Sequence, residues 1–369
     1  MPVFPMELTD EIIAWVLVVC THKWNKVTHQ NQTLLSCCLV CRAWLPASRH
    51  QLFQTLHIDT PERYDLLVSA VLHSEKMRIH LLSVRTVALS INSGTPFRRP
   101  FVLEFAGHLP NVNSMTFFSQ SVKAFLSHPT SGMAISRFAF VQSLSIFHCE
   151  FPSFGAFRRT LTSLPSLNNL RLKCPSWPDP AADLSPSLSH GASTVCRPAL
   201  LVLDVEWDPQ RDRDRAQQFI AWLSKTATSS SLLYLHAIGD STPLDKIGCM
   251  PTFGPSVFRF GQVLQRLEIG VGESHDLELE QFFCTLASLR VLRLRSECAI
   301  QPDTWVKIET LVHSLPRPKQ LVEVNIDVQS RYYDLPLELS HFDGLEALDA
   351  ALQPELFKEL QAVNFHVGP

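Results

Sequence analysis

The sequence is poor in charge, because only 18% of its residues are Asp, Glu, Lys or Arg and the formal net charge is -3. The excess of basic residues that is typical of nucleic-acid binding is therefore missing. A hydrophobic content of 46% excludes an intrinsically disordered chain. With 369 residues the chain can bury a large core, so we expect two or three structural units and no nucleic-acid partner.

Long apolar segments are also missing. The only early apolar run, IIAWVLVVC at residues 12–20, is shorter than the roughly 20 residues that a membrane-spanning helix requires. Glu7, Asp10 and Glu11 precede this run, at the place where a signal peptide carries positive charge. We expect a soluble intracellular protein, in the cytoplasm, the nucleus or both, with no membrane partner.

Common enzyme motifs are absent as well. The sequence contains no G-x-x-x-x-G-K-[ST], no G-x-S-x-G and no H-E-x-x-H, and GVGES at 270–274 lacks the third glycine of a dinucleotide site. Cys38 and Cys41, in CCLVC at 37–41, have a spacing that suits one metal ion, but no second Cys-x-x-Cys pair completes a zinc site. We expect a protein that is not an enzyme, with no catalytic residue, no metal and no cofactor.

A six-residue pattern organises most of the chain. It has apolar residues at its first, fourth and sixth positions, which is the L-x-x-L-x-L signature of leucine-rich repeats. The last two apolar positions point to one face of a short strand, and neighbouring strands must stack in a parallel sheet to bury that face. The copies begin at Val84, Val112, Val141, Leu167, Leu200, Leu232, Leu264, Leu289, Leu321 and Leu345.

Segments between these copies have the apolar spacing of helices, for example Leu279, Phe283 and Leu286. The predicted fold class is therefore α/β: residues 54–369 form a curved leucine-rich-repeat solenoid of parallel strands with intervening helices. Proline-rich and irregular composition predicts loop insertions at about 175–198 and 240–262.

Residues 1–53 are predicted to form a separate domain of three helices. After a first apolar helix and a polar connection at 21–32, the second helix places Leu34, Cys38, Cys41 and Leu45 on one face. This spacing favours buried apolar cysteines over metal ligands. A unit of this size is marginally stable on its own, and a partner often completes its core.

These residues resemble an F-box. The family pattern opens with Leu-Pro-x-Glu-Leu, continues with Cys-x-Leu-Val-Cys-Arg/Lys-x-Trp and ends with Leu-Phe before a strand. FPMEL from Phe4, CLVCRAW from Cys38 and LF from Leu52 are similar to it. The segment CRAWLPASRHQLFQTL is especially similar to F-box-like proteins of mushroom-forming fungi. Phe4 replaces the usual leucine, and the connection between the first two helices is longer than usual.

The resemblance implies the substrate-recognition subunit of an SCF-type ubiquitin ligase. The F-box of such a protein binds a Skp-type adaptor and, through it, a cullin-RING ligase, while the repeats bind a protein substrate. An alternative is a non-degradative repeat scaffold with a degenerate F-box, which the long connection would favour. The residues that the resemblance assigns to the adaptor suit internal packing of the helices equally well: Pro5, Leu8, Ile12, Leu39, Val40 and Trp44.

In a leucine-rich solenoid, the strand residues beside the buried apolar pair project onto the concave face. The face predicted here has charges of both signs and some aromatic residues, which suits a protein partner better than a polyanion, although an ordinary polar surface would look the same. Its candidate substrate-binding residues are Phe147, Arg171, Lys173, Asp204, Glu206, Tyr234, His236, Arg266, Glu268, Arg293, Arg295 and Asp327.

Overall fold

The computed structural model describes residues 6–19, 26–91, 100–119, 131–178, 197–208, 211–239, 254–271, 277–296, 302–316, 318–329, 346, 352 and 357–368. The chain divides into two compact units, Met1–Gln142 and Ser143–Pro369. Among the described helices, none is both long and apolar enough to cross a membrane.

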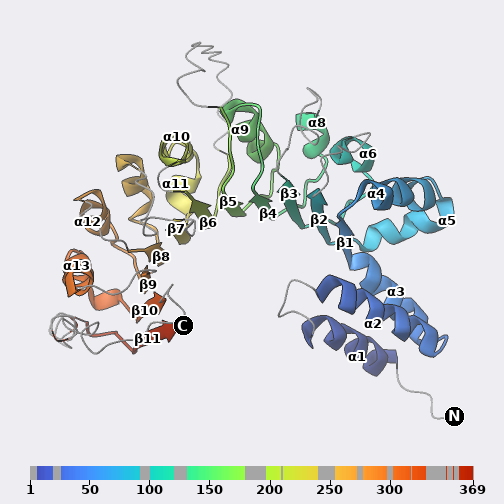
Figure 1. The fold of residues 1–369 in the computed structure, drawn as a ribbon, viewed down its shortest axis with the longest axis horizontal. Helices are drawn as coiled ribbons and strands as arrows, with labels where there is room; N and C mark the ends of the chain where they lie inside the picture. The colour runs from blue at the N-terminus through green and yellow to red at the C-terminus, as the bar shows by residue number, and fades with distance from the viewer. Residues whose placement is uncertain are drawn as a thin grey trace. The chain divides into compact units, whose positions relative to one another are not determined.

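The first unit begins with three helices and continues with strand-and-helix repeats (Figure 1). Strands β1, β2 and β3 pair in parallel and in chain order. The helices are α1 (Met6–Val19), α2 (Lys26–Val40), α3 (Trp44–Gln54), α4 (Pro61–Leu67), the π-helix η1 (Val68–Leu72), α5 (Glu75–Arg78), the 3-10 helix η2 (Ile79–Ser83), α6 (Phe101–Phe105) and α8 (Ser131–Ile135). The strands are β1 (Thr55–Ile58), β2 (Thr86–Ile91) and β3 (Ser114–Ser119).

The second unit is a parallel sheet in which β4 to β11 also follow chain order. Its strands are β4 (Ser143–Phe147), β5 (Asn169–Lys173), β6 (Val202–Trp207), β7 (Tyr234–Gly239), β8 (Arg266–Gly270), β9 (Val291–Ser296), β10 (Glu323–Gln329) and β11 (Ala362–Gly368). Its helices are α9 (Phe154–Thr162), α10 (Arg213–Leu223), α11 (Thr228–Ser231), η4 (Pro255–Phe260), α12 (Leu277–Phe283), α13 (Pro302–His313) and η5 (Pro318–Gln320).

The six-residue pattern predicts the strands correctly over most of the chain. Each described strand from β2 to β10 begins two residues after the start of a copy, as β6 at Val202 does after Leu200. Leu200, Leu203 and Val205, the three apolar positions of that copy, are fully buried. Burial of these positions, repeat after repeat, builds the core of each unit between its strands and its helices.

The end of the sheet differs from the prediction. The copy that begins at Leu345 lies almost wholly outside the described residues, and the strand that pairs with β10 is β11. Leu360, Val363 and Phe365 have the same apolar spacing and begin two residues before β11. The sequence therefore contains the same repeat signal for β11.

The loop predicted at 175–198 begins inside the core. Trp177 is 2% exposed, stacks on Phe157 with 5.1 Å between ring centroids, and donates Nε1–H to Oε1 of Gln218 at 2.8 Å. The predicted insertion is thus buried at its start, because an aromatic ring among prolines still gains more from burial than from water. Residues 179–196 lie outside the described residues. In the other predicted insertion, Val257 and Phe260 of η4 are buried.

The second helix begins earlier and ends earlier than predicted. Because α2 starts at Lys26, most of the polar stretch at 21–32 belongs to its first turns, and the prediction of a long connection is wrong. Because α2 ends at Val40, Cys41 lies beyond it and is exposed, Cys38 is half-buried, and Cys37 is the buried cysteine. Burial raises the pKa of the Cys37 thiol, which keeps it unreactive.

The predicted boundary at residue 53 falls where α3 gives way to β1, yet α3 also contacts β1 and η2. The rings of Phe53 and His80 stack with centroids 4.8 Å apart. The three helices and the first repeats therefore belong to one compact unit.

Replacing two glycines by alanine is expected to change the free energy of unfolding in opposite directions. A Cβ at Gly261 would lie 2.0 Å from Oγ1 and 2.9 Å from the carbonyl oxygen of Thr285, so Gly261→Ala should lower the free energy of unfolding by about 1–3 kcal/mol. At Gly155, in the first turn of α9, the nearest atoms would be 3.6 Å away, so Gly155→Ala should raise it by about 0.5 kcal/mol. Denaturant unfolding measures both, and a shift in the same direction for both variants would contradict the prediction.

Candidate functional site

The candidate site lies on the face of the second unit's sheet that is opposite its helices, which we call the strand face. In Figure 1, α9, α10, α12 and α13 lie on one side of β4–β11. Side chains of a strand alternate between the two faces. On β6, Leu203 and Val205 are fully buried toward the helices, whereas Asp204 and Glu206 point to the strand face and are partly accessible.

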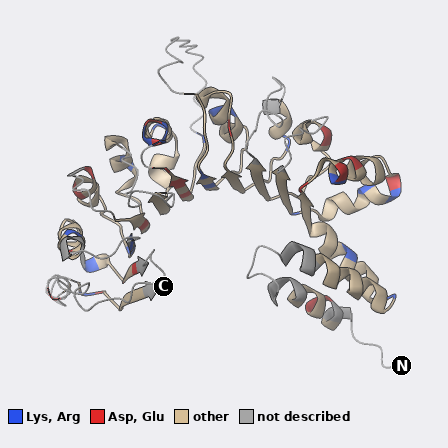
Figure 2. Cartoon of the chain, in the orientation of Figure 1, with Lys and Arg blue, Asp and Glu red and all other residues tan. Residues whose placement is uncertain are grey.

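Parallel register turns these positions into rows that cross the sheet. Figure 2 marks the basic positions in blue and the acidic positions in red along the strands. Every residue predicted for substrate binding lies on this face. One row contains Arg171, Asp204, His236, Glu268, Arg293, Asn325 and Asn364. The row two residues further along contains Phe147, Lys173, Glu206, Arg295 and Asp327, and the row two residues before contains Tyr234, Arg266 and Glu323.

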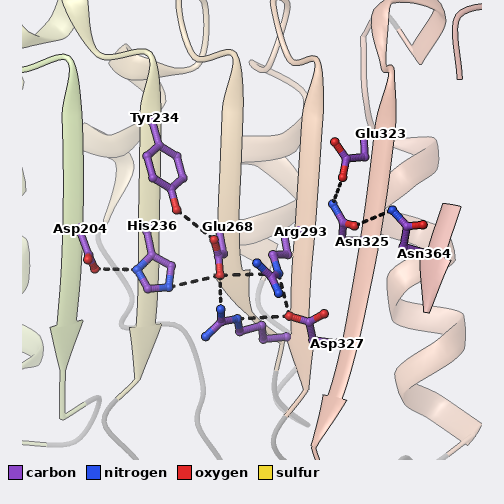
Figure 3. A network of polar contacts seen from close by, with 10 residues as sticks. Asp204, Tyr234, His236, Glu268, Arg293, Glu323, Asn325, Asp327 and Asn364 are labelled. Carbon is purple, nitrogen blue, oxygen red and sulfur yellow. Dashed lines mark hydrogen bonds and ion pairs between the residues drawn. The ribbon is translucent and has the colours of Figure 1, made fainter. Parts of the chain in front are cut away.

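Glu268 is the centre of the contacts on this face (Figure 3). Its side chain is only 4% exposed, and its Oε2 accepts a hydrogen bond from the Tyr234 hydroxyl at 2.9 Å. Its Oε1 lies 2.6 Å from Nη2 of Arg295 and 3.5 Å from Nε2 of His236. A carboxylate this deeply buried is stable only because cations and donors surround it.

Asp327, on β10, is a second buried carboxylate that binds arginines, and its side chain is 7% exposed. Its Oδ2 accepts a hydrogen bond from Nε of Arg293 at 2.6 Å and lies 3.4 Å from Nε of Arg295. The hydrogen bond to Asp327 raises the pKa of the Arg293 guanidinium. Beyond it, Nδ2 of Asn325 donates to Glu323, and Nδ2 of Asn364 donates to Oδ1 of Asn325, both at 2.9 Å (Figure 3).

The other end of the network is anchored by Asp204. Its Oδ1 is 2.5 Å from Nδ1 of His236 and its Oδ2 is 2.9 Å from Nε of Arg171. Lys173 and Glu206 form a separate ion pair of 2.6 Å in the next row. We call the connected set Arg171, Asp204, Tyr234, His236, Glu268, Arg293, Arg295 and Asp327 the polar ladder.

Aromatic rings support two arginines of the strand face. The guanidinium of Arg171 lies 5.5 Å from the ring centroid of Phe147, and that of Arg266 lies 5.0 Å from the ring centroid of Tyr234. Such cation–π contacts stabilise and orient an exposed arginine by about 0.5–1 kcal/mol. Asn364 was not predicted from the sequence, because β11 was itself missed.

The surroundings of Tyr234 predict an unusual titration. Burial, and then the hydrogen bond to the Glu268 carboxylate, raise the pKa of Tyr234 to about 12. Ionisation therefore costs more in the folded than in the unfolded protein, so stability from this group is complete below pH 10 and falls as the pH rises from 10 to 12. The difference in tyrosinate absorbance between wild type and Tyr234→Phe should titrate near pH 12, and a midpoint near 10 would contradict the prediction.

A second surface lies on α1 and α2 of the first unit. Ile13, Leu34 and Cys37 are buried among the three helices. Other large apolar side chains of α1 and α2 remain exposed, and Leu39 reaches 86%. We call this set the apolar surface, and it consists of Leu8, Ile12, Trp15, Leu35, Leu39 and Val40.

Most of the residues assigned to the adaptor therefore lie on the apolar surface. Leu8, Ile12, Leu39 and Val40 are exposed, Trp44 is half-buried, and Pro5 lies outside the described residues. Trp15 and Leu35 are exposed as well but were not among the residues assigned to the adaptor. Among the described residues, no group of His, Cys, Asp and Glu side chains is arranged to hold a metal ion.

A hollow of about 650 Å³ lies on the helix side of the second unit. None of the predicted site residues lines it, so it is separate from the polar ladder. Its lining residues are Arg158, Thr162, Arg197, Gln218, Ala221, Trp222, Lys225 and Thr226.

Repeated units of one parallel strand followed by a helix, with the L-x-x-L-x-L pattern on the strands from β2 to β10, are the architecture of a leucine-rich-repeat solenoid of the α/β class. No protein-family model and no curated protein matches the sequence.

Several solved structures resemble the chain, and three of them are as follows. LegL7, a leucine-rich-repeat-containing protein from Legionella pneumophila, is 18% identical with a TM-score of 0.43, over 76% of this chain and 81% of that one. The internalin inlF from Listeria monocytogenes is 13% identical with a TM-score of 0.35, over 80% and 65%. TLR13 in complex with ssRNA13 is 11% identical with a TM-score of 0.33, over 78% and 36%.

Proposed function

We propose that this chain is the substrate-recognition subunit of an SCF-type ubiquitin ligase, working inside the cell in the cytoplasm, the nucleus or both. Helices α1 and α2 bind a Skp-type adaptor through the apolar surface, and the strand face binds a protein substrate. The observation that carries the proposal is the exposure of Leu39, at 86%, together with its apolar neighbours on these helices.

The energetics of these side chains supports an interface. Burying one leucine side chain contributes about 1.5–3 kcal/mol, and the apolar surface leaves several such side chains in water. Leu8, Ile12 and Trp15 share one face of α1 at i, i+4 and i+7, and exposed apolar side chains gathered in this way mark protein-interaction sites. Leu8, Ile12, Leu39 and Val40 suited internal packing and adaptor binding equally well as a sequence, and their exposure favours adaptor binding.

In this proposal the chain performs no bond chemistry and needs no cofactor. The adaptor connects it to a cullin-RING ligase, and the strand face holds the substrate nearby. The effective concentration of a substrate lysine at the ubiquitin thioester rises as a result.

The alternative, a repeat scaffold with a degenerate F-box, depended on a long connection between the first two helices. Since α2 begins at Lys26, the connection is short and that argument no longer favours it. Recovery of the adaptor without a cullin would be the result that supports the scaffold.

Affinity purification of the full chain from its native cells, followed by mass spectrometry, tests the proposal. We expect a Skp-type adaptor and a cullin to co-purify, and their absence would contradict the proposal. Deleting residues 1–53 is a poor test, because α3 packs on β1 and η2 and its loss would disturb the first unit.

A further inference from the structure

We infer that the strand face selects a protein partner by an acidic segment in extended conformation, an inference that rests on the proposed function and specifies its substrate. The charges of the strand face are arranged in depth. Among the described residues, the four shortest Arg or Lys ion pairs on this face each have the cation as the more exposed partner. They are Arg171–Asp204, Lys173–Glu206, Arg293–Asp327 and Arg295–Glu268.

Each pair has one positive and one negative charge, but the positive side chain is the more accessible one. The four cationic side chains are between 30% and 54% exposed, whereas the four carboxylate side chains are between 4% and 27% exposed. Arg266, on β8, is exposed too and forms no ion pair with a described residue. A partner therefore meets guanidinium and ammonium groups first, with the carboxylates beneath them.

The buried carboxylates also hold the arginines in place. Arg171 contacts Asp204, and Arg293 contacts Asp327, each through Nε, the guanidinium nitrogen nearest the backbone. A guanidinium has five N–H donors, so donors on its outer nitrogens remain for a carboxylate of the partner. Because the polar ladder already orients these side chains, binding loses less conformational entropy.

The cations form two clusters on the sheet. Arg171 and Lys173 lie on β5, while Arg266, Arg293 and Arg295 lie on β8 and β9. From β5 to β9 there are four strand spacings, or about 19 Å, a distance that an extended peptide covers with about six residues. The best partner therefore carries two acidic groups about six residues apart.

A nucleic acid fits this arrangement less well. Asp204 and Glu206 on β6 separate the two clusters and are 20% and 27% exposed, so they would repel a continuous chain of phosphates. Two separate carboxylates of a peptide avoid these residues. The sequence showed charges of both signs on this face. The greater depth of the carboxylates is what favours an acidic peptide as the partner.

Fluorescence anisotropy on the full chain tests the inference with labelled twelve-residue peptides. A peptide with two Glu-Glu pairs six residues apart should bind at least about tenfold more tightly than the same peptide with Gln, and 0.5 M salt should weaken it strongly. A phosphoserine version that binds still more tightly supports the same chemistry with phosphate as its source. Equal binding of the Gln peptide, or tighter binding of a single-stranded DNA of matching length, overturns the inference.

Matched variants locate the peptide. Arg171→Gln should weaken the Glu peptide about five- to tenfold, while Arg159→Gln, an exposed arginine on α9, should leave it unchanged. Thermal melts of both variants check folding, and equal effects of both variants would overturn the inference. Adaptor binding in the same preparations separates the two proposals. If the adaptor binds and the peptide does not, only the inference fails, and in the converse case only the proposed function fails.

Discussion

Replacing Leu39 by glutamate is expected to remove binding of a Skp-type adaptor. Leu39 lies in the last turn of α2, is 86% exposed and belongs to the apolar surface. In an interface, the new carboxylate would be buried without a partner, which costs at least about 2 kcal/mol, or roughly 30-fold in the dissociation constant. Calorimetric titration of the purified full chain with the adaptor measures this loss.

Leu66→Glu is the matched control for Leu39→Glu. Leu66 lies on α4 of the same unit and is 64% exposed, so the same chemical change occurs in water on another helix. Both variants should keep the thermal midpoint of the wild type, because neither side chain packs in the core. Wild-type affinity of Leu39→Glu, or an equal loss with Leu66→Glu, would contradict the assignment of the apolar surface to the adaptor.

Replacing Glu268 by glutamine is expected to cause a large loss of stability. The glutamine amide can still accept the hydrogen bond of Tyr234, but it no longer compensates the guanidinium of Arg295, 2.6 Å away. Removing this buried carboxylate costs about 2 kcal/mol, since Arg295 keeps only its longer contact of 3.4 Å to Asp327. The denaturant midpoint at constant slope measures this change.

Glu206→Gln is the matched control for Glu268→Gln. Glu206 pairs with Lys173 in the same way, at 2.6 Å, but its side chain is 27% exposed and water can replace it. Its loss should cost less than about 1 kcal/mol. Equal losses in the two variants would show that burial of Glu268 does not determine the energy of the polar ladder.

The sequence predicted the strands well, because each carries its own apolar pattern. The pattern is local, and copies such as the one at Leu200 required no knowledge of other repeats. It missed β11, where LQAVNF from Leu360 has the same spacing and pairs with β10. The copy LEALDA from Leu345 lies almost wholly outside the described residues.

The N-terminal helices show a different limit. Periodicity indicated that α1 and α2 are amphipathic, but the apolar residues on them exceed what a three-helix unit can bury. Ile13 and Leu34 occupy the small interior, whereas Leu8, Ile12 and Leu39 remain outside. Which apolar residues are internal depends on where each helix ends and on the angle at which the helices pack. The apolar periodicity of one helix determines neither of these.

The sequence by itself therefore determined the α/β repeat architecture and the face of the sheet on which each strand residue lies. Alternation along a strand is a property of the backbone, so it assigned Arg171, Asp204 and Glu268 to the strand face. Only the tertiary structure decided how deep each charge lies on that face. Depth depends on side chains from neighbouring strands, which come from repeats about thirty residues apart, and it places Glu268 beneath Arg295.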